Sequence, residues 1–170
     1  EDISGWDMSQ VTSMALMFYG AVAYNQPLNN WDVSRVEDAT RTFSSMLVFN
    51  QPLDSWDVSQ VTSMKYMFAG AQDFNQPLDS WDVSRVEDAS YMFAMAMAFD
   101  QDLSSWRLCS VTSIYQMFYY AAAFDQDLST WCFENNVMGH SGTFTGTPCA
   151  GTYCGVTYGG CEAAGLGCVT

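Results

Sequence analysis

The feature that most constrains this chain is a strict sequence period, which every tryptophan follows. The six tryptophans are evenly spaced at Trp6, Trp31, Trp56, Trp81, Trp106 and Trp131. Four other apolar columns, which begin at Val11, Phe18, Tyr24 and Leu28, keep the same spacing. Self-similarity at such a period is the signature of repeat architectures. One unit cannot bury its apolar face alone, so we expect the units to stack and share one core.

The segment around each tryptophan predicts a short strand. Its pattern is Leu-x-x-Trp-x-Val, as at residues 53–58, and it ends with apolar and polar residues in alternation. Stacked strands of this kind would place equivalent residues about 4.8 Å apart. The residue between the tryptophan and the valine is then expected to face outward.

The residues after this strand predict a helix of about three turns. Apolar residues recur at steps of three and four from Val61 to Ala71, and Pro77 cannot continue a helix. In alternate units, Ser34 and Glu37 have the spacing of a capping box, which marks a helix start. The sequence therefore predicts an α/β solenoid with one short strand and one short helix in each repeat.

A second, weaker period of two units lies on top of the first. Units with Gln10 and Gln60 alternate with units that carry Arg35 and Arg85 at the same position. Two explanations remain open at this point. One is duplication of a two-unit block, and the other is a functional two-unit repeat along one edge.

Composition and charge exclude several classes of function. The chain has 170 residues, of which 5 are basic and 19 acidic, for a net charge of −14. This balance argues against binding to nucleic acid or to anionic membrane surfaces, which need a basic face. No apolar run reaches the ~18 residues of a membrane span, so we expect no membrane insertion of this segment.

The sequence also argues against an enzyme. His140 is the only histidine, so neither a Ser-His-Asp triad nor a site with several histidine ligands can be built. Neither a GxGxxG nor a GxxxxGK[ST] phosphate-binding motif is present. We therefore predict no catalytic residues, no bound metal and no cofactor.

The last part of the chain predicts a separate cap. After Trp131 the period decays into Gly-, Thr- and Cys-rich sequence, which divides the chain into repeats at 1–131 and a cap at 132–170. The six cysteines are Cys109, Cys132, Cys149, Cys154, Cys161 and Cys168. An even number of cysteines in loop-rich sequence predicts disulfides and an oxidising compartment, although their pairing cannot be deduced. Zinc is the weaker alternative, because no CxxC pair is present.

One candidate binding surface is the outward side of the predicted strands. It carries a column of aspartates with serines beside it: Asp7, Asp32, Asp57 and Asp82, with Ser55, Ser80 and Ser105. The structural interpretation is a solvated acidic face whose carboxylates bond locally. The functional interpretations are a surface for calcium, which prefers oxygen ligands, or a ladder that binds a glycan or a protein.

A second candidate site is the edge of the first unit. Ile3 occupies the leucine position before the first tryptophan, so the sequence begins inside a repeat. We expect such an edge to expose Ile3, Trp6, Val11, Met14 and Phe18 and to pair with another chain. Contacts of this type that do not close generate filaments, unless further repeats precede residue 1.

The repeat resembles a known family. Its consensus, Leu-x-x-Trp-x-Val-Ser-x-Val-x-x-Met-x-x-Met-Phe-x-x-Ala-x-x-Phe-Asn-Gln-Pro-Leu, is similar to the BspA-like surface-protein repeat over residues 1–131. That family is related to leucine-rich repeats and occurs in mycoplasma surface lipoproteins and in algal and protist surface proteins. The late units depart from the consensus: Asp102 and Asp127 replace proline, Arg107 replaces aspartate and Cys109 replaces serine.

The resemblance implies a fold, a location and a general function. The fold is a right-handed, leucine-rich-repeat-like solenoid, and the location is the cell surface or the extracellular space. The function it implies is binding, adhesion or display toward a protein or glycan ligand. The alternative is a structural subunit that assembles head to tail into an extracellular filament.

Overall fold

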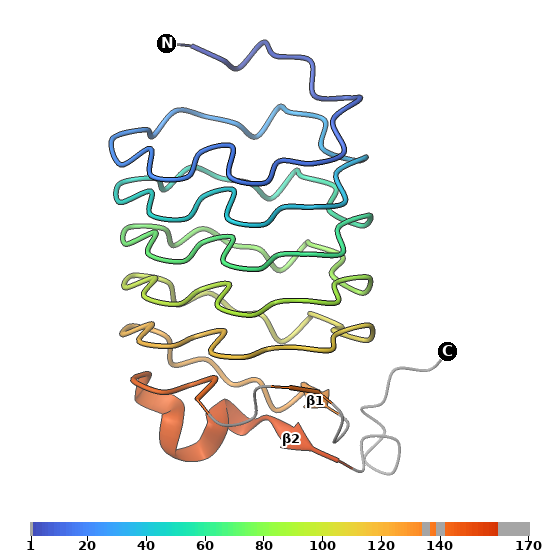
Figure 1. Ribbon diagram of the computed structural model, residues 1–170. Helices are drawn as coiled ribbons and strands as arrows, with labels where there is room; N and C mark the ends of the chain where they lie inside the picture. The colour runs from blue at the N-terminus through green and yellow to red at the C-terminus, as the bar shows by residue number, and fades with distance from the viewer. Residues whose placement is uncertain (1, 134–136, 139–141, 160–170) are drawn as a thin grey trace.

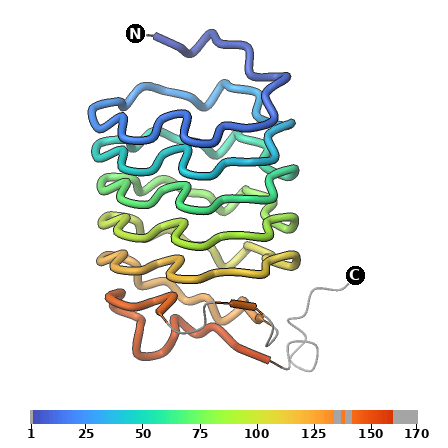
Figure 2. Tube along the Cα trace, in the orientation of Figure 1, coloured from blue at the N-terminus to red at the C-terminus, as the bar shows by residue number. Residues whose placement is uncertain are grey.

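The computed structural model describes residues 2–133, 137–138 and 142–159. The chain winds into successive turns, one for each sequence repeat, that lie one above the next, as Figures 1 and 2 show. We call each turn a coil and number the coils from the N-terminus, with the first ending at Asn25. Regular elements among the described residues are few: strand β1 (Cys132–Phe133), the 3-10 helix η1 (Pro148–Gly155) and strand β2 (Thr157–Tyr158).

The backbone ladder between coils does not lie where the strand pattern predicts it. Parallel bridges join one residue of each coil in the series Ser13, Asp38, Ser63, Asp88, Ser113 and Met138. In the segment predicted as a strand, the Trp56 amide instead donates to the carbonyl of Leu53 at 3.1 Å and closes a turn. This local bond occupies the amide that a strand would offer to its neighbour, so the ladder forms later in the repeat.

The predicted helix is replaced by a series of tight turns. The amides of Tyr66, Phe68 and Gly70 donate to carbonyl oxygens of the next coil at 2.7–2.9 Å. Between them, the amides of Met67 and Ala69 donate to the carbonyl three residues earlier at 3.0 and 3.1 Å. The turns place residues that are three or four positions apart on the same side of the coil, which reproduces the apolar spacing of a helix. Because every second amide bonds outside its own coil, no α-helical ladder forms here.

The capping box is also absent, and an aspartate takes over its role. The Ser34 amide donates to Oδ1 of Asp32 at 3.1 Å, and the Ser34 hydroxyl donates to the same oxygen at 2.6 Å. The Glu37 amide donates to the Thr12 carbonyl of the preceding coil at 2.8 Å. The sequence Asp-x-Ser therefore forms a turn that feeds the inter-coil ladder, in place of a helix start.

Backbone conformation explains why a helix cannot continue through this segment. Each of the first five coils places two residues in the left-handed region. One column is Leu16, Arg41, Tyr66, Tyr91 and Gln116, with φ between 53° and 63°. The other is Gly20, Ser45, Gly70, Met95 and Tyr120, with φ between 54° and 72°. Left-handed positions favour glycine, because other residues lose roughly 1–2 kcal/mol there.

This geometry predicts opposite effects of two exchanges at equivalent positions. Ser45→Gly should raise the free energy of unfolding by about 1 kcal/mol, because glycine removes the steric cost at φ 61°. Gly70→Ser should lower it by a similar amount, since the new Cβ meets only ordinary contacts near Ser45 at 3.7 Å. Urea unfolding of both variants checks this prediction. Equal signs for the two changes would contradict it.

Aromatic side chains fill the interior from one coil to the next. The rings of Phe43, Phe68 and Phe93 stack at 5.3 and 5.5 Å, and all three are fully buried. The Trp56 indole donates its Nε1 proton to the carbonyl of Leu28 in the preceding coil at 3.0 Å. Four other tryptophans make the equivalent bond. Each coil is thus tied to the one before it by a buried hydrogen bond as well as by ring contacts.

An amide ladder closes the coils on another side. Oδ1 of Asn50 accepts the Asn75 amide at 3.0 Å and the Gln76 side-chain amide at 2.8 Å. Asp100 accepts the equivalent pair of bonds with its own Oδ1. This column of asparagines and aspartates therefore has a structural role, because its acceptor oxygen is occupied by the next coil.

The two-unit alternation also has a structural role. Oε1 of Gln10 accepts a hydrogen bond from the Arg35 guanidinium at 2.5 Å, and Gln60 accepts one from Arg85. In the bridge series, Asp38 lies between two serines. Alternation therefore places a neutral partner beside each charge and keeps like charges two coils apart, which lowers their repulsion.

The coil contacts continue beyond the predicted boundary at residue 131. The Phe144 ring stacks on Phe118 at 5.5 Å, and the Phe118 amide donates to the Thr143 carbonyl at 2.9 Å. The segment 148–159 then covers this last coil. Strand β2 pairs in parallel with β1, and the Gly159 amide donates to the Phe133 carbonyl at 2.7 Å. Thr143 and Phe144 therefore still make contacts of the coil type, and the division at residue 131 stays a prediction.

Candidate functional site: the surface of the coils

The predicted aspartate column lies on the surface of the first four coils. Asp7, Asp32, Asp57 and Asp82 are all exposed. Each Oδ1 accepts the backbone N–H of the serine two residues later, at 3.0–3.1 Å. The carboxylates therefore hold the turn that follows each tryptophan, as the structural interpretation expects.

These bonds also stabilise the charged form of the aspartates. The serine hydroxyl and then the serine amide lower the pKa of Asp7, Asp32 and Asp82 below the ordinary value of 3.8. A donor to a carboxylate favours the ionised acid, so the same bonds that shape the turn oppose its protonation.

The lowered pKa values predict a loss of stability in acid. A carboxylate with a lower pKa in the folded state stabilises the fold above its unfolded pKa, and this contribution disappears as the pH falls through the folded value. We expect the free energy of unfolding to decline as the pH falls below about 4. Replacing Asp7, Asp32 and Asp82 together with asparagine keeps an acceptor oxygen but should flatten this decline. Urea unfolding across the acid range tests it, and an unchanged slope would contradict the assignment.

The serines of the predicted site also form hydrogen bonds within the fold. The hydroxyls of Ser80 and Ser105 each donate to a carbonyl of the preceding coil at 2.9 Å. Ser55 makes the equivalent bond to the carbonyl of Asn29. Within the described residues, no group of three or more His, Cys, Asp or Glu side chains is arranged to hold a metal ion. The calcium and glycan interpretations of this surface remain predictions.

The predicted assembly edge is mostly covered. Ile3, Met14 and Phe18 are buried, and Val11 is half-buried, because their side chains point into the interior and pack on the second coil. The expectation that all five residues are exposed is therefore wrong for these three. Trp6 is 55% exposed and stacks on Trp31 at 6.2 Å.

The cysteines of the described chain are all oxidised. Cys149 and Cys154 form a disulfide within η1, with their Cα atoms 4.8 Å apart. Cys109 and Cys132 are also disulfide-bonded. The remaining two predicted disulfide residues, Cys161 and Cys168, lie outside the described residues, and so does His140.

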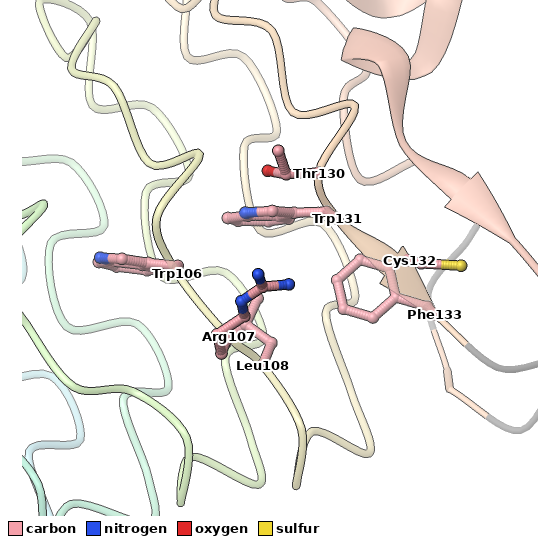
Figure 3. A pocket seen from close by; sticks show the side chains of 7 residues that line it. All are labelled: Trp106, Arg107, Leu108, Thr130, Trp131, Cys132 and Phe133. Atoms are coloured by element: carbon pink, nitrogen blue, oxygen red, sulfur yellow. The ribbon is translucent and has the colours of Figure 1, made fainter. Parts of the chain in front are cut away.

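A small hollow beside the last tryptophans is not a ligand site. Figure 3 shows the rings of Trp106 and Trp131 lying parallel, with the Arg107 side chain beside them and Phe133 beyond. The space that these side chains enclose is about 20 Å³, which has room for about one water molecule. The substitution of Arg107 for aspartate ends the acidic column here without creating a pocket of useful size.

A different surface emerges from the distribution of charge around the coils. No aspartate or glutamate occurs in one stretch of nine residues per coil, at 14–22, 39–47, 64–72, 89–97 and 114–122. We call the surface formed by these stretches the acid-free face. Its charged residues are Arg41 and Lys65, which carry a charge of +2. Because the net charge of the whole chain is −14, the rest of the chain carries −16.

The acid-free face also holds most of the large apolar side chains exposed to solvent. Nine of the thirteen such residues in the described chain belong to it: Leu16, Met17, Tyr19, Val22, Leu47, Met95, Met97, Tyr115 and Tyr120. Leu16, Tyr19, Met95 and Tyr120 are each about half exposed, between 48% and 54%. Sequence reasoning missed this face, although an acid-free window in every repeat of a chain this acidic was available as a signal.

Side-chain contacts hold part of this face in a fixed arrangement. The rings of Tyr66 and Tyr91 stack at 4.4 Å, and the Arg41 guanidinium lies 4.6 Å from the Tyr66 ring centre. Lys65 forms an ion pair with Asp88 at 3.5 Å. Arg41 and Tyr91 belong to the coils on either side of Tyr66, so they cover both of its ring faces. The tyrosine ladder therefore stiffens the surface and leaves no open Tyr66 face for a sugar to stack on.

Comparison with known proteins gave one match. A family model described as "Mycoplasma protein of unknown function, DUF285" matches residues 1–94 and 42–150, which together span most of the chain. No curated protein and no solved structure matched the chain. Among the described residues, no helix is both long enough and apolar enough to cross a membrane.

Proposed function

Because the chain belongs to the family described as "Mycoplasma protein of unknown function, DUF285", we propose that it is a repeat module of the cell surface or extracellular space that binds a macromolecular partner. Its fold in this proposal is a leucine-rich-repeat-like solenoid of the BspA-like type. The partner is a protein, and the contact is made by the acid-free face. The module acts by binding and display, without a catalytic step.

The repeat contacts support the proposed fold class. Equivalent residues of successive coils bond to one another in the indole, amide and backbone ladders. Each coil buries its apolar residues against its neighbours, which is the property that defines a solenoid. The turns that replace the helix distinguish this chain from repeats that contain a full helix.

The cysteine chemistry supports the proposed location. Disulfides persist in oxidising environments and are rare in reducing ones. All cysteines of the described chain are oxidised, and one disulfide lies in the segment that covers the last coil. This arrangement suits a protein that works outside the reducing interior of a cell.

The clustering of apolar side chains on the acid-free face carries the proposal of a protein partner. Large exposed apolar patches mark sites of interaction, whereas single exposed apolar residues are ordinary. Here they recur in the first, second, fourth and fifth coils, on either side of a tyrosine ladder that begins in the third coil. The aspartate column, in contrast, uses one carboxylate oxygen of each member to hold its own turn.

An array experiment tests this function. Labelled protein is applied to spotted extracellular proteins, including the protein itself, and to a parallel set of glycans. We expect saturable binding to one or more protein spots, which Met95→Lys with Tyr120→Lys abolishes and Asp57→Asn with Asp82→Asn preserves. Both pairs alter exposed side chains, so circular dichroism can verify that each variant folds. Binding confined to glycans, or loss of binding only in the aspartate pair, would overturn the proposal.

A further inference from the structure

We propose that the partner of the acid-free face is a second copy of this chain, packed face to face in an antiparallel, two-fold symmetric dimer. This inference rests on the proposed function, because it names the partner of the same surface. It follows from the distribution of charge, from the arrangement of apolar side chains along the stack and from the place of the two cations.

The charge distribution restricts contact between two copies to the acid-free faces. Outside the acid-free face the chain carries a charge of −16, so most contacts between two copies would bring carboxylates together. Packing through the acid-free faces turns the acidic surfaces of both copies away from the interface. Like-charge repulsion then acts over the thickness of two stacks, where salt screens it, because the Debye length is about 8 Å at physiological ionic strength.

The apolar side chains fit the antiparallel arrangement. One group lies in the first two coils and includes Leu16, Val22 and Leu47, and a second lies in the fourth and fifth coils and includes Met95 and Tyr120. The third coil between them contributes none of the large exposed apolar side chains. A two-fold axis through the third coil would place the first group of each copy on the second group of the other. Such an isologous contact closes at two subunits.

The two cations fit the same arrangement. Arg41 belongs to the second coil, so the antiparallel packing places it opposite the fourth coil of its partner, away from the partner's Arg41. Lys65 belongs to the third coil, near the axis, but its charge is already compensated by the ion pair with Asp88 at 3.5 Å. Neither cation therefore opposes the contact, whereas a parallel arrangement would bring the two Arg41 guanidinium groups together.

Sedimentation velocity over a concentration series tests the dimer. We expect a monomer–dimer equilibrium. Its dissociation constant should decrease when the NaCl concentration is raised from ~0.05 M to ~0.5 M, because salt screens the repulsion between two acidic chains. Leu47→Glu with Met97→Glu should weaken the dimer about tenfold or more, since it buries charge in the interface. Met138→Glu is the matched control. Met138 is 64% exposed, but it lies outside the acid-free face, at the position of the bridge series that Asp38 and Asp88 occupy in other coils. A protein that stays monomeric at both salt concentrations overturns the inference, as does open-ended growth beyond the dimer.

Chemical cross-linking provides a second test that needs no variant. Lys65 is the only lysine of the chain and lies in the coil through which the proposed axis passes. An amine-reactive cross-linker should therefore join Lys65 to Lys65 of the partner subunit, and mass spectrometry identifies that peptide pair. Dimers without this pair would rule out the antiparallel arrangement. Array binding only to other proteins, by a protein that stays monomeric, would overturn the dimer and leave the proposed function standing.

Discussion

Replacement of Trp56 with alanine is expected to lower the free energy of unfolding by about 3–5 kcal/mol, as for other large aromatic side chains removed from a core. The side chain is 4% exposed and packs against the Phe43 ring at 5.6 Å. Its loss removes buried aromatic contact in the middle of the stack. It also removes the indole donor that lies 3.0 Å from the Leu28 carbonyl, which then keeps only its hydrogen bond from the Trp31 amide at 3.1 Å, so one buried hydrogen bond is lost as well.

Two further variants separate these contributions. Trp56→Phe keeps most of the apolar volume but removes the hydrogen bond, so it should cost less than the alanine variant. Trp6→Ala is the matched control from the same column, because Trp6 is 55% exposed and its removal opens little interior space. Urea unfolding of the three proteins makes the comparison. If Trp56→Ala unfolds at the same urea concentration as the wild type, the tryptophan column does not support the core.

The second large effect is expected at Gly146, near the end of the coil stack. Gly146→Ala should lower the free energy of unfolding by about 2–4 kcal/mol, because the residue has φ 82° and a new Cβ would lie 2.8 Å from Cδ1 of Tyr120. The same Cβ would lie 3.2 Å from the Tyr120 Cα atom, so rotation of the tyrosine side chain cannot relieve the clash completely.

Gly151 is the matched control for this change. It lies five residues later in η1, and a Cβ built there meets nothing within 4 Å. Gly151→Ala should therefore leave the melting temperature almost unchanged, while Gly146→Ala lowers it by several degrees. Similar melting temperatures for the two variants would show that the last coil does not pack against Tyr120 as described.

Several features of the fold could be predicted from the sequence. The tryptophan, phenylalanine and leucine columns identify the buried residues, since from the second coil onward every member of these columns is buried. The role of the column of asparagines and aspartates in joining repeats was also accessible, because a side-chain acceptor oxygen recurs at the same position of every repeat and so meets the same neighbours each time. The local bonding of the aspartates follows from the Asp-x-Ser spacing alone.

The helix could not be excluded from the pattern of apolar residues. Tight turns with bonds from residue i to residue i−3 return side chains to one face at nearly the same spacing as a helix, so both structures satisfy the pattern from Val61 to Ala71. The left-handed conformation of Tyr66 and Arg41 leaves no trace in residue type, because neither is a residue that favours positive φ. Hydrogen bonds to the next coil stabilise these conformations. Such bonds join two repeats, so the sequence of one repeat does not reveal them.

The sequence by itself therefore determined the period, the buried columns and the division between an acid-rich and an acid-free part of each repeat. These properties belong to residue type and spacing, which the chain carries before it folds. The tertiary structure alone decided where the ladder lies, that turns replace the helix, and that Ile3, Met14 and Phe18 are covered. The physical reason is that every second amide of a turn segment finds its acceptor in the next coil, which is in place only after stacking.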